Sequence, residues 1–222
     1  MWRDATLVAG RDLRVELRSR VTTNQVAPFA LLVLVLFAFA LDPDGPVLQR
    51  ATPGLYWITV LFAAVLAIAR SAAIDEADGV RDALRLSALE PAGVFVGKAL
   101  AVAAELVALE VLLGVGVVIL YGAEPAGVGL LAATCACATV AVASTGTLYG
   151  ALVSGLRVRE TLLPLLLLPV LAPVLIAATR AFEAALVGVV ADGWPWCGLL
   201  AAFAVLYSVA GALAYGTLLE GS

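Results

Sequence analysis

Several residue types on which enzymes and metal sites depend are missing from this sequence. It contains no histidine, its one methionine is Met1, and no GxxxxGK[ST] motif is present. Without histidine the chain cannot form a Ser-His-Asp triad or a HExxH zinc site. Without the glycine-rich loop it cannot bind ATP in the manner of P-loop proteins. We therefore expect neither an enzyme nor a metal-binding protein, and an intramembrane enzyme is the least favoured interpretation.

Charged residues are also scarce. They make up 14% of the 222 residues, and 63% of the chain is hydrophobic. Soluble domains contain about 25% charged residues. Long stretches carry no charge at all, namely 21–41, 51–69, 125–156, 161–179 and 193–219. Each is near or above the length of about 20 apolar residues that a membrane-spanning helix needs. The pattern indicates a polytopic membrane protein rather than a soluble helical one.

One more segment has the length of a span but is not free of charge, because it includes Lys98, Glu105 and Glu110. With it, we predict an all-α fold in which the whole chain forms a single transmembrane domain of six spans. Their approximate bounds are 22–41, 53–72, 94–121, 128–153, 161–179 and 196–219.

The positive charges predict the orientation of the chain in the membrane. Most of the 13 lysine and arginine residues precede the first span or lie near the second and fourth connections, whereas Arg50 and Arg180 lie on the other side. Cytoplasmic loops are enriched in lysine and arginine. We therefore expect a multi-pass protein of the cell membrane, inner or plasma, with both termini in the cytoplasm.

Residues 1–20 alternate arginines with apolar residues in the manner of an interfacial amphipathic helix. The apolar side would consist of Leu7, Val8, Leu13, Val15 and Leu17, and the arginines that can reach lipid phosphates are Arg3, Arg11, Arg14 and Arg18. We expect this segment to lie on the lipid bilayer rather than to cross it. The alternative is a solvated, charged tail.

Two carboxylates fall inside the third predicted span. A charged residue at mid-bilayer costs at least about 2.5 kcal/mol, so such groups normally face a cavity or a partner. Glu105 and Glu110 are therefore candidates for an intramembrane polar site, and a structural contact between helices is the alternative. Five residues along a helix separate two side chains by about 140°. The pair is thus poorly placed to share a proton.

The fifth predicted span contains Pro164, Pro169 and Pro173. Each proline removes a backbone donor and kinks a helix. We expect a bent helix here, which is either a moving part of a transporter or simply an unusual shape.

The connection Ile74–Pro91 is rich in charge between two oily stretches. Asp78 can cap a short helix that begins near Gly79. Val80 and Leu84 would give that helix an apolar side. A membrane protein without an ATP site needs a cytoplasmic partner to do work, and this connection is the place where such a partner could dock. A solvated loop is the alternative.

Four stretches of the sequence resemble the haem exporter B (CcmB) family, the B subunit of the cytochrome c maturation system. They are "LRVELRSR" (13–20), "TPGLYWITVLFAAVLAIAR" (52–70), "DEADGVRDALRLSALEPAGVFVGKAL" (75–100) and "LRVRETLLPLLLLPVLAPVLIAAT" (156–179). The resemblance covers nearly the whole chain. It implies the fold of an ABC-2 type transporter permease, with an N-terminal interfacial helix and a cytoplasmic coupling helix.

The resemblance also implies partners. The family pairs with a cytoplasmic ABC ATPase subunit (CcmA-like), a haem-handling membrane protein (CcmC-like) and a small helper subunit, and nucleic acid has no part. Haem is then a substrate of the complex rather than a cofactor bound by this chain alone, because the chain lacks histidine and methionine as axial ligands. The small residues Gly146 and Gly150 favour close helix packing, either within the chain or in a homodimer.

Residues of the ATPase-docking loop carry over by position from the family. They are Asp75, Glu76, Asp78, Gly79, Leu84, Leu86, Ser87 and Leu89, flanked by Arg70 and Lys98. The chain departs from the family at Ala69, where many relatives have an acidic residue, and at Ala88, where the usual motif has proline. The coupling turn is therefore expected to differ in shape.

Two alternatives share this architecture. One is an ABC-2 permease for another hydrophobic or anionic substrate, and the other is a non-transporting scaffold that anchors the ATPase.

Overall fold

The computed structural model describes residues 1–19, 22–41, 46–76, 89–153 and 159–220, and in these ranges all of the regular secondary structure is helical. The N-terminal half contains α1 (Trp2–Ser19), a π-helical turn η1 (Thr22–Val26), α2 (Ala27–Ala40) and α3 (Pro46–Glu76). The C-terminal half contains α5 (Pro91–Tyr121), α6 (Val128–Val153), α7 (Arg159–Val187) and α8 (Val190–Glu220).

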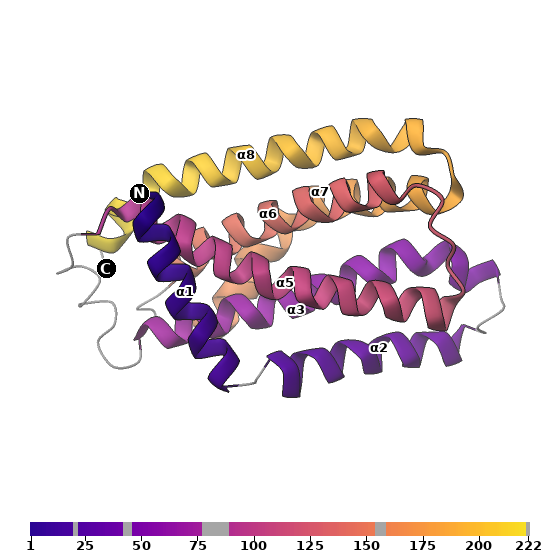
Figure 1. Ribbon diagram of the computed structural model, residues 1–222, viewed down its shortest axis with the longest axis horizontal. Helices are drawn as coiled ribbons and strands as arrows, with labels where there is room; N and C mark the ends of the chain where they lie inside the picture. The colour runs from indigo at the N-terminus through magenta and orange to yellow at the C-terminus, as the bar shows by residue number, and fades with distance from the viewer. Residues whose placement is uncertain (20–21, 42–45, 77–88, 154–158, 221–222) are drawn as a thin grey trace.

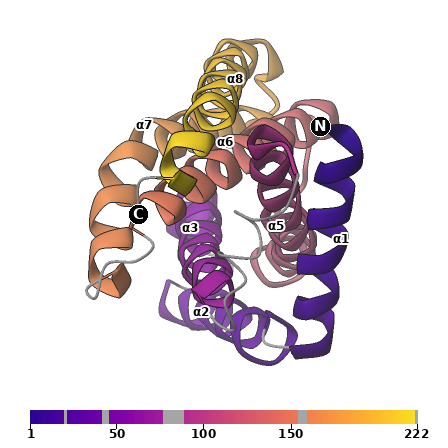
Figure 2. The ribbon, with the colours of Figure 1, turned by 90° about the vertical axis from the view of Figure 1, so that its left-hand side faces the viewer.

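Six of these helices run along the long axis of the molecule and form a bundle, whereas α1 lies across one end of it, beside α5 (Figures 1 and 2). Both chain termini lie at this same end (Figure 1). We call it the α1 end. The opposite end holds the turn between α5 and α6 and the start of α8 (Figure 1).

Five helices of the described chain are long and apolar enough to cross a membrane, with bounds of Pro46–Ser71, Pro91–Tyr121, Val128–Val153, Thr161–Val187 and Val190–Leu218. The region of the first predicted span differs, because its apolar helical stretch, Asn24–Ala40, has fewer than 18 residues. Its N-terminal part is the polar π-helical turn TTNQV. The chain is thus a multi-pass, all-helical membrane protein.

Several helices extend beyond the predicted spans. The third span begins at Pro91, and α3 begins at Pro46, in both cases with proline at the helix start. Proline is favoured at the first position of a helix because an N–H there has no acceptor within the helix. Proline, which lacks this N–H, therefore loses no hydrogen bond. The left-handed Gly122, with φ of +61°, ends α5 and turns the chain toward α6.

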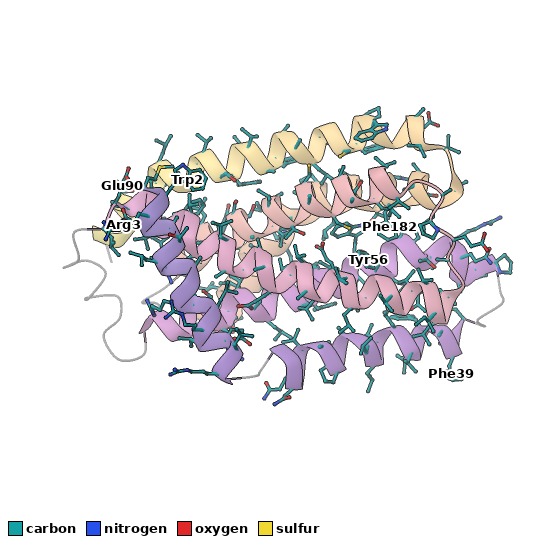
Figure 3. The ribbon with its side chains drawn as sticks, in the orientation of Figure 1. Trp2, Arg3, Phe39, Tyr56, Glu90 and Phe182 are labelled. Carbon is teal, nitrogen blue, oxygen red and sulfur yellow. The ribbon has the colours of Figure 1, made fainter. Side chains whose placement is uncertain are left out.

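Aromatic rings from two helices meet inside the bundle, toward the end opposite α1 (Figure 3). Tyr56 of α3 stacks on Phe182 of α7, with ring centroids 4.6 Å apart, and Trp57 contacts both rings edge-on. Gly146 of α6 lies directly against Ile68 of α3, so a Cβ at that position would collide with the isoleucine side chain. The small residue at 146 therefore serves packing within the chain.

Candidate functional site at the α1 end

Helix α1 lies unusually close to the first turns of α5. A Cβ added to Gly97 would come within 2.7 Å of the Ala5 carbonyl oxygen, and one added to Gly93 within 2.9 Å of the Met1 carbonyl oxygen. Ala5 and Val8 are buried in this contact. Glycine at two positions one helical turn apart lets the two helices approach closely, so α1 is a fixed part of the bundle.

Ion pairs connect α1 to two different spanning helices. Glu16 Oε2 lies 3.2 Å from Arg70 Nε of α3. Asp12 Oδ2 lies 3.5 Å from Lys98 Nζ of α5. Lys98 and Glu16 are both buried. Because Arg70 lies near the end of α3 and Lys98 near the start of α5, α1 joins the two helices on either side of the predicted docking segment.

Glu105 lies in the same region. It lines a small pocket together with Asp12, Glu16 and Arg70. With Lys98 these residues form what we call the ionic cluster: Asp12, Glu16, Arg70, Lys98 and Glu105. Three carboxylates and two cations from three helices thus gather at one point. Charged groups near a bilayer need partners, and here those partners come from different helices.

The start of α1 also contacts Glu90, the residue immediately before α5. The Met1 amine lies 2.9 Å from Glu90 Oε2 and 3.3 Å from Asp4 Oδ2. The Glu90 N–H donates to Asp4 Oδ2 at 3.4 Å. Hydrogen bonds to Glu90 and then to Asp4 raise the pKa of the Met1 amine above its ordinary value. Trp2, Arg3 and Glu90 gather at this end of the molecule (Figure 3).

The predicted docking residues are only partly covered by the structure. Asp75 and Glu76 form the last residues of α3, and Leu89 is half-buried against a cluster that includes Val8 and Phe95. The remaining ones, Asp78, Gly79, Leu84, Leu86 and Ser87, lie outside the described residues. Their docking role stays a prediction.

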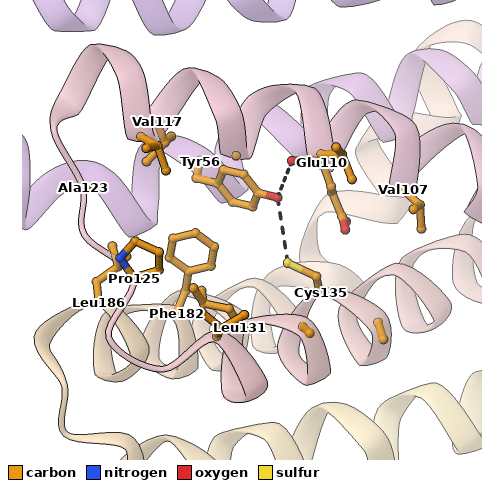
Figure 4. Close-up of a pocket in the computed structure, with 16 residues that line it drawn as sticks. Tyr56, Val107, Glu110, Val117, Ala123, Pro125, Leu131, Cys135, Phe182 and Leu186 are labelled. Carbon is orange, nitrogen blue, oxygen red and sulfur yellow. Dashed lines mark hydrogen bonds between the residues drawn. The ribbon is translucent and has the colours of Figure 1, made fainter.

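Glu110 has a different environment from Glu105, as the helical spacing predicts. Its Oε1 accepts a hydrogen bond of 2.7 Å from Thr139 Oγ1 of α6. Tyr56 Oη donates to the Glu110 backbone carbonyl at 3.1 Å and lies 3.9 Å from Cys135 Sγ (Figure 4). A cavity of about 480 Å³ adjoins these groups between α5 and α6.

The three prolines of α7 do not interrupt it. The helix continues from Arg159 to Val187 through Pro164, Pro169 and Pro173. Its packing face is made by other residues, namely the buried Leu163, Leu167, Leu171 and Val174. The prolines lie beside this face, half-buried or exposed. Whether α7 moves in a transport cycle stays a prediction.

Sequence reasoning missed Asp12, Glu16 and Thr139. The prediction for residues 1–20 rested on the arginines and the apolar residues and did not consider the acidic ones. Asp12 and Glu16 are four residues apart and therefore lie on one face of a helix. That face is turned inward, and the exposed Arg3, Arg14 and Arg18 lie on the other side. Among the described residues, no group of three histidine, cysteine, aspartate or glutamate side chains is placed to hold a metal ion.

Comparison with known proteins supports the resemblance inferred from the sequence. The family model described as CcmB protein matches residues 3–222. "Heme exporter protein B" of Bradyrhizobium diazoefficiens is 32% identical over 208 residues, which cover 92% of this chain and 91% of that protein. The protein of the same name from Rhodobacter capsulatus is 34% identical over 170 residues, 75% of this chain and 76% of its own length. That from Paracoccus denitrificans is 33% identical over 173 residues, 77% and 78% of the two chains.

Proposed function

Because the chain belongs to the CcmB family, we propose that it is the membrane permease subunit of an ABC transporter complex that exports or delivers haem for cytochrome c maturation. The long apolar helices support a membrane component. The sequence contains no P-loop motif, and the proposal therefore places ATP hydrolysis in a separate subunit. Haem is the substrate of the complex in this proposal.

In our proposal the ATPase docks at the α1 end, on the segment between α3 and α5. This docking site is supported by the two ion pairs that α1 makes with the helices on either side of the segment, Glu16–Arg70 and Asp12–Lys98. Through them a displacement of the docking segment, which pulls on the end of α3 and the start of α5, also moves α1. Helix α1 then acts as a brace that keeps the two helices in step when the ATPase moves.

The remaining parts of the proposal follow from this arrangement. The α1 end faces the cytoplasm, α2 completes six spans in the ABC-2 architecture, and the protein resides in the cell membrane with both termini inside. A haem-handling membrane protein and a small helper subunit complete the complex, in which two copies of this chain can pair.

Two sets of variants test the proposal in cells that express the whole complex. Asp78→Lys combined with Gly79→Trp should reduce recovery of the ATPase with the membrane and abolish cytochrome c assembly. Arg180→Gln, at an exposed site on α7 near the end of the molecule opposite α1, is the matched control and should leave both unchanged. Normal ATPase recovery in the docking variant would refute the docking site. Normal cytochrome c assembly when the whole chain is deleted would refute the proposed function.

A further inference from the structure

Two cavities meet at the end of the bundle opposite α1. The first, the α5/α6 cavity, has a volume of about 480 Å³ and reaches from Val107 to Val118 along α5 and on to Ala123 in the turn that follows (Figure 4). The second, the end cavity, has a volume of about 450 Å³ and lies around the turn that follows α5. Ala123 and Leu186 line both cavities. The two cavities therefore share part of their walls and lie side by side.

The α5/α6 cavity opens toward the lipid. Its walls include Val107, Val111, Val118 and Val128, whose side chains are exposed on the surface of the bundle. These residues lie in helices that cross the membrane, so lipid acyl chains surround the mouth of the cavity. Gly114 also lines the cavity, and a Cβ added there would meet no atom within 4 Å. The missing side chain leaves room for an apolar ligand.

The end cavity is polar. It is lined by Gln49 and Thr52 of α3 and by Glu124 from the turn after α5. Glu124 is exposed, and it is the one acidic side chain among the described residues of this lining. A ligand with an apolar body in the first cavity would thus place its polar end beside a carboxylate.

The charges of the lining residues select among amphipathic ligands. Among the residues that the structure describes, neither lining contains lysine or arginine, while Glu110 lines the first cavity and Glu124 the second. Haem carries two carboxylates and no cationic group, so it has nothing that could pair with Glu124. A phospholipid with an ammonium headgroup matches the arrangement, because its acyl chain suits the apolar cavity and its ammonium group suits Glu124.

We propose that the two cavities form a lipid site, which binds one phosphatidylethanolamine molecule from the leaflet opposite α1. One acyl chain lies in the α5/α6 cavity beside Gly114, and the ammonium group lies at Glu124. The site places a structural lipid against α5, α6 and the α3–α7 aromatic contact. It does not depend on the transported substrate.

Native mass spectrometry of the purified full chain tests the site. The protein is delipidated and then exposed to equal amounts of phosphatidylethanolamine and phosphatidylglycerol. The natural chain should retain one phosphatidylethanolamine in preference to phosphatidylglycerol. Gly114→Leu, whose side chain fills the cavity, should lower this occupancy by about tenfold, which corresponds to about 1.4 kcal/mol. Gly129→Leu is the control, because its Cβ also meets no atom within 4 Å and Gly129 does not line the cavity.

A second variant tests the headgroup assignment separately. Glu124→Gln should lower the preference for phosphatidylethanolamine by roughly threefold, the scale of an exposed charge pair, and leave total lipid retention unchanged. Equal retention of the two lipids by the natural chain would overturn the proposal, and so would equal occupancy in Gly114→Leu and Gly129→Leu. Haem is titrated in parallel. A haem absorbance change that Gly114→Leu abolishes and Gly129→Leu keeps would assign the cavity to haem instead and overturn the lipid site.

Discussion

Lys98 of α5 and Asp12 of α1 form an ion pair with 3.5 Å between Nζ and Oδ2, although 86 residues separate them in the sequence. The lysine side chain is 4% exposed and the aspartate side chain 12%. A buried ion pair contributes little net stability, but removal of one partner leaves an uncompensated charge in a poor solvent. The pair therefore specifies where α1 sits rather than how stable the fold is.

The first prediction concerns this pair. Lys98→Met should destabilise the protein by about 3 kcal/mol because Asp12 would stay buried with less compensation, and Arg11, 3.7 Å from its other oxygen, offsets only part of the loss. The double variant Asp12→Leu with Lys98→Met should recover most of the stability, since neither charge remains. Thermal unfolding of the purified protein in detergent measures both. A double variant as unstable as the sum of its parts would contradict the coupling.

The second prediction concerns the close approach of α1 and α5. Gly97→Val should push α1 away, because its Cβ would lie 2.7 Å from both the Ala5 carbonyl oxygen and Val8 Cβ. Overpacking of this kind costs about 1–3 kcal/mol. Gly198→Val in α8, where a Cβ meets nothing within 4 Å, is the control. Unfolding temperature and cytochrome c yield should both fall in the first variant and not in the second. Equal behaviour of the two would show that the contact is not required.

The third prediction concerns the buried carboxylate of α5. Thr139→Val removes the donor of the 2.7 Å hydrogen bond to Glu110 with little change of shape. The unsatisfied carboxyl group should cost about 1–3 kcal/mol. In a Glu110→Gln background the same threonine substitution should cost less, because the acceptor is then uncharged. A double-mutant cycle on thermal stability gives the difference, and a coupling of zero would mean that the bond contributes nothing.

The sequence was a reliable guide to the long helices. A long apolar run without charge is stable in the lipid bilayer, where its backbone must form a helix. The run 125–156 therefore predicted the position of α6 closely. The first span was less well predicted because an uncharged run also contains the polar residues TTNQV, which form the π-helical turn before α2. Charge alone does not separate these from lipid-facing residues.

The ionic cluster could not be predicted, for a different reason. The sequence reveals that Arg70 and Lys98 flank a charged segment, and this suggested a surface role near the ATPase. Their contacts with Glu16 and Asp12 depend on how α1 crosses the bundle, which no local pattern encodes. Helix geometry did predict that Glu105 and Glu110 face different ways, because that relation lies within a single helix.

The proposed complex requires that a nucleotide-driven motor is held at the α1 end, on the segment between α3 and α5. Site-specific photo-crosslinking in the intact complex tests it most directly, with the probe placed at Asp78 and, for comparison, at the exposed Arg180. We expect an adduct with the ATPase subunit from position 78 and none from position 180. An adduct from position 180, or none from position 78 while the ATPase still co-purifies, would contradict it.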